Sequence, residues 1–241
     1  GQSMPNPTVL FGDPLPFDTG KGIVPQPRLP REEQQEQQTR DLEIDPKKHT
    51  PRSLLGQISK LKNELIDHDT FSSRAETEAE RMLAQVYRLY SDRLTAAKAL
   101  DFDDIIMTTV HLLQAFPDLR EQYRRRFRHV LVDEYQDTNH AQYVLIRELC
   151  SAEVDGAAGE LEVAPPELMV VGDSDQSIYA FRGADIRNIV EFERDFPGAK
   201  VVLLEQNYRS TQNILNAANA VIAKNPDRKP KRLWSDAGEG E

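Results

Sequence analysis

The stretch His129-Val-Leu-Val-Asp-Glu-Tyr-Gln-Asp-Thr138 constrains the fold more than any other part of this chain. Its apolar run, Val130 to Val132, ends abruptly at two adjacent carboxylates, Asp133 and Glu134. A short unbroken apolar run is typical of a strand buried on both faces of a parallel sheet, and open α/β sheets bind ligands at the carboxyl ends of such strands. An acidic pair there suits Mg²⁺, with the second carboxylate placed to orient or deprotonate a water. Two solvated acids at a strand end would leave the same pattern.

Two later stretches repeat this arrangement. The pattern predicts a second strand from Leu168 to Asp173 and a third from Lys200 to Glu205. Helices are predicted at about Asn139–Cys150, at about Ile178–Phe196 with a break near Gly183, and over a final amphipathic stretch from Ile214 to Ile222. Alternating strands and helices imply parallel strands joined by right-handed crossovers.

Each predicted strand ends in polar residues, and we name these groups the first cluster (Asp133-Glu134), the second cluster (Gly172–Gln176) and the third cluster (Glu205–Arg209). In a parallel sheet all three would lie along one edge. Together they supply carboxylates, an amide and a guanidinium. These are the groups of a nucleoside-triphosphate site, where catalysis consists mostly of positioning and charge neutralisation. Simple polar caps on three strands are the alternative.

Aromatic and basic residues follow the second cluster. Tyr179 and Phe181, with Arg182, suit stacking on the unpaired bases of a nucleic acid. The alternative is that one or both rings pack into the core.

The first half of the chain is predicted to be helical. One amphipathic helix begins at Pro51, with Thr50 as its N-cap, and extends to about Asp67. A second helix is predicted over about Ser73–Leu100, with one apolar stripe (Leu83, Val86, Tyr87, Tyr90 and Leu94). Asp101 or the residues beside it open a third helix, which ends before Pro117 and carries Phe102, Ile105, Ile106, Thr109 and Leu113. The fourth is a basic helix, with Arg120, Arg124, Arg125, Arg126 and Arg128. The basic helix is either a solvated face or a phosphate contact, and the first is favoured.

Composition excludes several classes of protein. No apolar run reaches the roughly 20 residues of a membrane span, and one cysteine, Cys150, excludes an internal disulfide framework and fits the cytoplasm. No metal-ligand spacing of the zinc type is present. The net charge of −10 argues against bulk affinity for nucleic acid, although a local basic groove is compatible with it.

The first 40 residues differ from the rest because they are rich in Pro, Glu and Gln, and we predict a flexible arm there. They contain Thr19-Gly20-Lys21-Gly22, which invites comparison with a phosphate-binding loop. The pattern G-x-x-x-x-G-K-[ST] requires Gly at position 15 and Ser or Thr at position 22, but Leu15 and Gly22 stand there.

Long ordered motifs resemble the UvrD/PcrA/Rep-type superfamily 1 DNA helicases. The matching stretches are Val130–Thr138 (Walker B, motif II), Val171–Ala184 (motif III), Leu204–Thr211 (motif IV), Leu100–Asp104, and the upstream Asp45-Pro-Lys-Lys and Lys60–Asp67 of a helical insertion. The resemblance implies an α/β fold, an incomplete P-loop NTPase (RecA-like) parallel sheet with a helical insertion. We divide the chain into the arm (1–40), the insertion and helices (41–128), and the parallel α/β part (129–241).

The resemblance also implies roles at the matching positions, with ATP and Mg²⁺ as cofactors. Asp133 would hold Mg²⁺, and Glu134 would act as the base toward the attacking water. Gln176 would sense the γ-phosphate and couple it to the DNA site. The remaining roles are adenine stacking (Tyr208), γ-phosphate contact (Arg209) and contact with single-stranded DNA (Tyr179 and Phe181, beside Arg182). The family couples ATP hydrolysis to 3′-to-5′ movement on single-stranded DNA and to unwinding at junctions with duplex, in repair or replication, with other repair proteins as partners.

Two departures limit what the resemblance implies. No Walker A loop and no second motor domain are present in the sequence, so we expect the chain alone not to be a competent helicase. Two alternatives stay open: a non-catalytic module that binds single-stranded DNA or protein, and part of a helicase-nuclease of the RecB or AddA kind.

Overall fold

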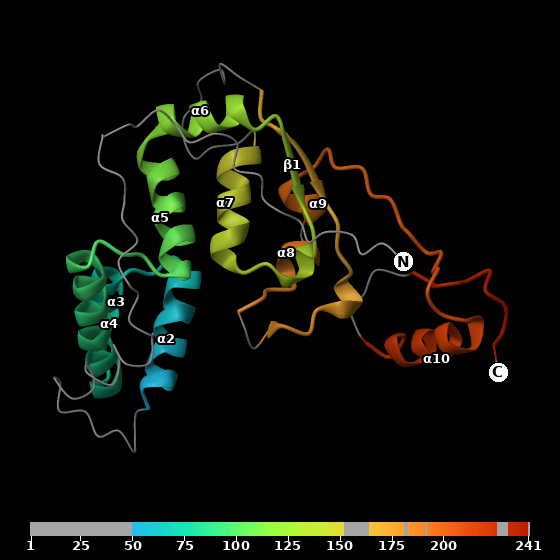
Figure 1. Cartoon of the computed structure of the whole chain (residues 1–241), viewed down its shortest axis with the longest axis horizontal. Helices are drawn as coiled ribbons and strands as arrows, with labels where there is room; N and C mark the ends of the chain where they lie inside the picture. Colours follow the sequence, from blue (N-terminus) through green and yellow to red (C-terminus); the bar gives the residue numbers. More distant parts are fainter. Residues whose placement is uncertain (1–49, 152–163, 181–182, 191, 226–230, 241) are drawn as a thin grey trace.

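The computed structural model describes residues 50–151, 164–180, 183–190, 192–225 and 231–240 (Figure 1). The predicted arm, Phe181 and Arg182 lie outside these ranges. The described residues form a helical part, α2 to α6, followed by a two-stranded parallel sheet with helices packed on it. This is an α/β arrangement. No described helix combines the length and the hydropathy of a membrane span.

Local capping determines the first helices. Helix α2 (Pro51–Asn63) begins as predicted, because the Thr50 side chain accepts a hydrogen bond from the Ser53 amide at 3.3 Å. It ends earlier than predicted, and Leu65 beyond it adopts a left-handed conformation with φ 57°. The helix predicted over about Ser73–Leu100 begins later, as α4 (Glu78–Ala96), and a separate short helix, α3 (His68–Arg74), precedes it, because Asp67 and Thr77 each provide an N-cap.

The helical part has its own core. Four residues of the stripe predicted on α4 are buried, and they pack on Leu54 and Ile58 of α2 (the stripe residues are Leu83, Val86, Tyr87 and Tyr90). Leu94 is partly buried against the same cluster.

Helix α5 (Phe102–Ala115) begins after Asp101 and ends before Pro117, as predicted, but only some of its apolar residues are buried. Phe102 and Ile105 are exposed, whereas Asp104, Met107, Val110 and Leu113 are buried. The Asp104 carboxylate lies 2.6 Å from the buried ammonium of Lys62 on α2. This ion pair turns the acidic side of α5 inward, which hydrophobic periodicity does not reveal.

The basic helix is α6 (Pro117–Arg126), and the prediction of a solvated face is wrong for Arg124. The Arg124 guanidinium is buried and donates to the backbone carbonyls of Glu148 and Ser151, at 2.8 and 2.9 Å. Arg120 pairs with the Glu148 carboxylate at 2.8 Å. These cations therefore stabilise the carboxyl end of the following helix, α7 (His140–Cys150), where cations are favoured.

The sheet confirms the first two predicted strands, although the second ends at Val170 and not at Asp173 as predicted. Strands β1 (His129–Val132) and β2 (Glu167–Val170) pair in parallel, with Val132 opposite Val170. Alternate residues, including Val130 and Val170, pack against α7 and the segment that follows β2. Leu131 and Met169 on the other face are exposed, so among the described residues the sheet is covered on one face, not on both as predicted.

The third predicted strand is wrong. Residues 200–204 have no strand structure, and the side chains from Val201 to Leu204 are exposed. The nearest pairing is an isolated parallel bridge between Gln206 and Trp234. A strand forms only when a neighbour satisfies its backbone groups, and within the described residues no backbone hydrogen bond involves 200–204.

The helix predicted over 178–196 is mostly replaced by short elements. Within this range the described helices are α8 (Arg187–Val190) and α9 (Phe192–Asp195). A 3₁₀ turn, η2 (Ser174–Gln176), precedes the range. Gly183 has φ 89°, which ends any helix at the predicted break. Helix α10 (Gln212–Ile222) forms as predicted, with Leu215 buried and Ile214 and Val221 exposed.

Candidate functional site

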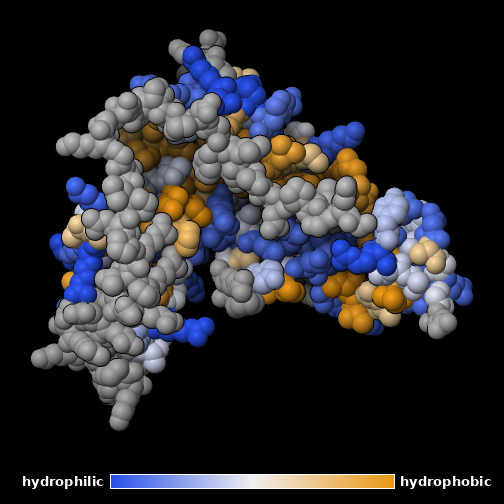
Figure 2. Space-filling model, viewed as in Figure 1, coloured by the Kyte–Doolittle hydropathy of each residue, from blue (hydrophilic) through white to orange (hydrophobic). Residues whose placement is uncertain are grey.

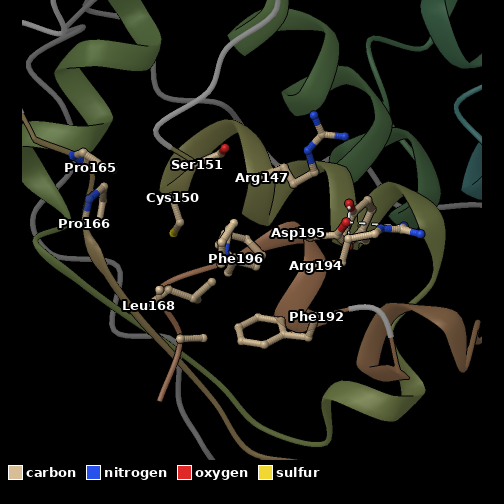
Figure 3. A pocket seen from close by; sticks show the side chains of 14 residues that line it. Arg147, Cys150, Ser151, Pro165, Pro166, Leu168, Phe192, Arg194, Asp195 and Phe196 are labelled. Carbon is tan, nitrogen blue, oxygen red and sulfur yellow. Dashed lines mark hydrogen bonds and ion pairs between the residues drawn. The ribbon is translucent and has the colours of Figure 1, made fainter. Parts of the chain in front are cut away.

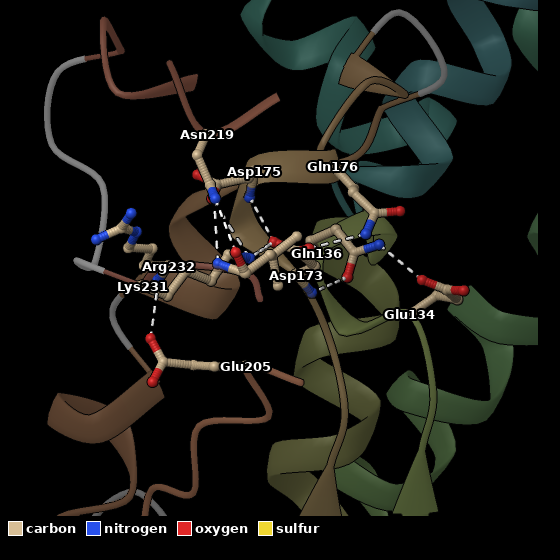
Figure 4. A network of polar contacts seen from close by, with 10 residues as sticks. Glu134, Gln136, Asp173, Asp175, Gln176, Glu205, Asn219, Lys231 and Arg232 are labelled. Atoms are coloured by element: carbon tan, nitrogen blue, oxygen red, sulfur yellow. Dashed lines mark hydrogen bonds and ion pairs between the residues drawn. The ribbon is translucent and has the colours of Figure 1, made fainter. Parts of the chain in front are cut away.

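The first and second clusters leave the sheet at the same edge. Beyond the paired strands, the Val171 amide donates to the Val132 carbonyl at 2.8 Å, and the Tyr135 amide donates to the Val171 carbonyl at 2.9 Å. Asp133 and Asp173, which follow these residues, therefore lie on adjacent chain segments at the carboxyl edge of the sheet. Figure 4 shows Glu134 and Asp173 at this edge. Ligands of open α/β sheets bind at this edge.

The acidic pair forms a tight turn. Asp133 Oδ1 accepts a hydrogen bond from the Glu134 amide at 2.9 Å, and both side chains are exposed. Glu134 adopts a left-handed conformation (φ 49°, ψ 45°) that leads into the 3₁₀ turn η1 (Tyr135–Asp137). Such strain in a non-glycine residue costs of order 1 kcal/mol and concentrates at functional sites.

Gln136 links the first cluster to the second. Its side chain is buried, with 1% of its surface exposed. Its Nε2 donates to Glu134 Oε2 at 2.8 Å, and its Oε1 accepts from the Asp173 amide at 2.9 Å (Figure 4). Gly172 permits this approach, because a Cβ there would lie 2.7 Å from Gln136 Oε1. Sequence reasoning missed Gln136; the only signal was an amide inside a predicted site.

Asp173 organises the second cluster. Its Oδ2 accepts from Gln176 Nε2 at 2.8 Å, its Oδ1 accepts from the Asp175 amide at 2.9 Å, and Lys231 also donates to Oδ1. Burial acts to raise the pKa of Asp173, but the hydrogen bonds from Lys231, Gln176 and Asp175 outweigh it, so the pKa lies below its ordinary value. The carboxylate is therefore ionised at neutral pH and holds the amide of Gln176.

The third cluster is a loop and not a strand end. Asn207 Oδ1 accepts hydrogen bonds from the amides of Arg209 and Ser210, at 2.9 and 2.8 Å. Tyr208 is 85% exposed and its hydroxyl donates to Gln206 Oε1 at 2.9 Å. Arg209 is exposed, and within the described residues neither side chain bonds to the first two clusters. The first and second clusters therefore lie together as predicted. Among the described residues, the third cluster is connected to the second through the segment that contains Lys231, which bonds to Asp173.

Of the residues predicted to contact DNA, the described ranges include Tyr179. It is partly exposed and lies just beyond η2, beside the exposed Ile178. The ring of Tyr179 is therefore not packed wholly into the core, which was the alternative to a role in stacking.

A cavity of about 570 Å³ lies elsewhere, between the carboxyl end of α7, the start of β2 and α9 (Figure 3). Its lining includes Tyr143, Cys150, Leu168, Phe192 and Asp195. It adjoins the amino end of β2, and none of the predicted site residues lines it. Burial raises the pKa of the Cys150 thiol to about 11, so this thiol is not an activated nucleophile.

The donor set fits Mg²⁺ shared with a phosphate. Within the described residues no group of three or more His, Cys, Asp or Glu side chains could form a metal cage. Mg²⁺ commonly uses one or two carboxylates and takes its other ligands from substrate phosphates and water. The exposed carboxylate of Asp133 meets that requirement, whereas a structural zinc or calcium site would need more protein ligands.

Comparison with known proteins gives consistent relatives. The sequence family described as "UvrD/REP helicase N-terminal domain" matches residues 25–197. "ATP-dependent DNA helicase UvrD1" of Mycobacterium bovis is 60% identical over 205 residues, which is 84% of this chain and 26% of that protein. "ATP-dependent DNA helicase PcrA" of Bacillus subtilis is 50% identical over 197 residues, 82% of this chain and 25% of that protein.

This chain therefore spans about a quarter of the length of these relatives. The family match covers more than half of the chain and includes the first and second clusters. The chain belongs to the UvrD/REP helicase N-terminal domain family.

Proposed function

We propose that this chain is part of the first motor domain of an ATP-dependent DNA helicase, with a RecA-like sheet whose carboxyl edge binds Mg²⁺ and ATP. The observation that carries this proposal is the hydrogen-bond chain from Glu134 through Gln136 to the Asp173 amide. It ties together two strand-end clusters that a nucleotide site requires side by side. A pair of unrelated polar caps has no need of a buried amide between them.

In this proposal the two acids of the first cluster have different roles. Asp133 holds Mg²⁺, which neutralises charge on the phosphates when it is bound. Glu134 orients the attacking water and accepts its proton. The hydrogen bond from Gln136 Nε2 to Glu134 Oε2 fixes the direction of that carboxylate.

The second and third clusters supply the remaining contacts. Gln176, held by Asp173, faces the γ-phosphate, and Arg209 contacts the same group. The exposed ring of Tyr208 stacks on the adenine. Single-stranded DNA and its junctions with duplex contact Tyr179, Phe181 and Arg182, and movement along the strand runs 3′ to 5′, in repair or replication.

Nucleotide binding tests the first part of the proposal. We expect calorimetric titration of the chain with Mg²⁺-ATP to show binding that Asp133→Asn weakens. Asp92→Asn is the matched control, because Asp92 is exposed on α4, far from the sheet edge. Loss of Mg²⁺ dependence in Asp133→Asn but not in the control supports the assignment.

Binding of a labelled oligo-dT strand separates the proposal from its main alternative. We expect Phe181→Ala to weaken binding and Phe102→Ala, a change of an exposed ring on α5, to leave it unchanged. Undetectable Mg²⁺-ATP affinity combined with retained strand binding would favour a non-catalytic interaction module instead.

A further inference from the structure

Lys231 reaches the second cluster from a distant part of the sequence. Its ammonium donates to Asp173 Oδ1 and lies 3.3 Å from Asp175 Oδ2. The three side chains are mostly shielded from water, with exposures of 17% for Lys231, 25% for Asp173 and 10% for Asp175. A cation between two partly buried carboxylates is screened much less than a surface pair.

The segment that begins at Lys231 also pairs with the third cluster, and we name residues 231–236 the brace. The Trp234 amide donates to the Glu205 carbonyl at 3.0 Å, and the Asn207 amide donates to the Trp234 carbonyl at 2.7 Å. The Arg232 amide donates to Glu205 Oε1 at 2.8 Å (Figure 4).

Helix α10 holds the middle of the brace. Asn219 Nδ2 donates to the Leu233 carbonyl at 2.8 Å, and the Leu233 amide donates to Asn219 Oδ1 at 3.2 Å. The brace is therefore bonded to the third cluster along its length and to the second cluster at its first residue.

We propose that Lys231 is a positioning residue of the candidate nucleotide site: it fixes the Asp173 carboxylate that holds the Gln176 amide, and so couples the second cluster to the loop that carries Tyr208 and Arg209. This inference rests on the proposed function. Asp173 uses both of its oxygens, one for Gln176 and one for Lys231 and the Asp175 amide. Movement of the brace therefore reaches the Gln176 side chain through a single carboxylate.

The test is NMR of the isotopically labelled chain without nucleotide, comparing Lys231→Met with wild type. We expect the Asp173 carboxyl carbon to titrate at higher pH, because the carboxylate loses a cationic partner. The backbone amide of Asp175 and the side-chain amide of Gln176, which both donate to this carboxylate, should exchange about tenfold faster, the factor for weakening one hydrogen bond to a charged group. Lys231→Arg, which keeps the charge, should restore most of both readouts.

The matched control is Lys224→Met, which removes an exposed lysine just beyond α10 and should change neither readout. Fluorescence of Trp234, the single tryptophan of the chain, reports separately whether the brace stays in place. As a second variant, Asp173→Ala removes both acceptor oxygens and should free the Gln176 side chain even where Lys231→Met folds poorly.

Unchanged titration of Asp173 and unchanged exchange at Gln176 in Lys231→Met would overturn the inference, including when Trp234 shows that the brace has moved. That combination would leave Lys231 with a purely structural role. These NMR measurements need no nucleotide, so they test the contact between Lys231 and Asp173 separately from the proposed function. Failure of the wild-type chain to bind Mg²⁺-ATP would refute the proposed function alone.

Discussion

At the scale of single residues, the site depends on close contacts that composition does not reveal. Gly172 and Gln136 illustrate this, because a glycine at the end of a strand pattern signals only a turn. The structure shows that the missing Cβ makes room for the Gln136 amide and for Ile189, with contacts that would be 2.7 and 2.9 Å. Sequence reasoning identified Asp133, Glu134 and Gln176 as candidates but not the residues that orient them.

Gly172→Ala tests this packing. We expect it to lower the free energy of unfolding by about 1–3 kcal/mol, because the new methyl group displaces a buried amide and its hydrogen bonds. Gly56→Ala is the matched control: it lies within α2, where a Cβ meets nothing within 4 Å, and should stabilise by about 0.5–1 kcal/mol. Chemical denaturation of both variants measures the difference, and equal effects of the two changes would contradict this account of Gly172.

At the scale of elements, local sequence signals predicted where helices begin, but they did not predict how the elements contact one another. Thr50 was predicted as a helix cap and Asp101 as one candidate, and both form caps, because a cap acts within a few residues of itself. The apolar residues of α5 did not reveal which face of the helix is buried, because Lys62, which belongs to another helix, pairs with the acidic residues at its start. The segment 200–204 was mispredicted because strand formation depends on a neighbour and not on its own apolar residues.

The Lys62 cluster allows a direct test of an element contact. The Lys62 ammonium, with no exposed side-chain surface, lies 2.9 Å from the Asp101 carboxylate and 2.6 Å from that of Asp104. Lys62→Met leaves both carboxylates without their cation and should destabilise the chain by about 3–5 kcal/mol in chemical denaturation. The control Lys60→Met removes an exposed lysine of the same helix and should change stability by less than about 0.5 kcal/mol.

The same cluster predicts a pH dependence. Burial acts to raise the pKa of Asp101, but hydrogen bonds from the Asp104 amide and Lys62 outweigh it, so the pKa lies below its ordinary value of 3.8. Because the folded pKa is the lower one, this stabilisation is present above pH 3.8 and is lost as the pH falls through the folded value. Unfolding measured against pH should show a smaller acid-side slope in Lys62→Met; an unchanged slope would count against the cluster as its source.

Hydrogen exchange tests the unpaired segment. The amides of residues 200–204 donate no backbone hydrogen bond within the described chain, so they should exchange at rates near those of a free peptide. The amide of Val171, which donates to Val132 at 2.8 Å, is the comparison and should be protected. Equal protection of the two segments would show that 200–204 has a strand partner in solution.

At the scale of the whole molecule, the described residues cover the two-stranded sheet on one face only. Apolar side chains are exposed on the outer face of β1 and β2, along 201–204, and on α5 and the residue after it (Leu131, Met169, Val202, Leu204, Phe102 and Phe116 are examples). Figure 2 shows apolar patches that interrupt the polar surface on one side of the molecule. A parallel sheet is normally covered on both faces. The alternation of strands and helices predicted the α/β class, but not which face the described residues would leave open.

We propose that the chain provides the acidic half of a nucleotide site and that, because its sequence lacks the G-x-x-x-x-G-K-[ST] pattern, it does not turn over ATP by itself. The most direct measurement is phosphate release from Mg²⁺-ATP by the purified chain, with and without oligo-dT. We predict no release above the rate of a Glu134→Gln variant under either condition. DNA-stimulated release by the wild-type chain that Glu134→Gln abolishes would contradict the claim.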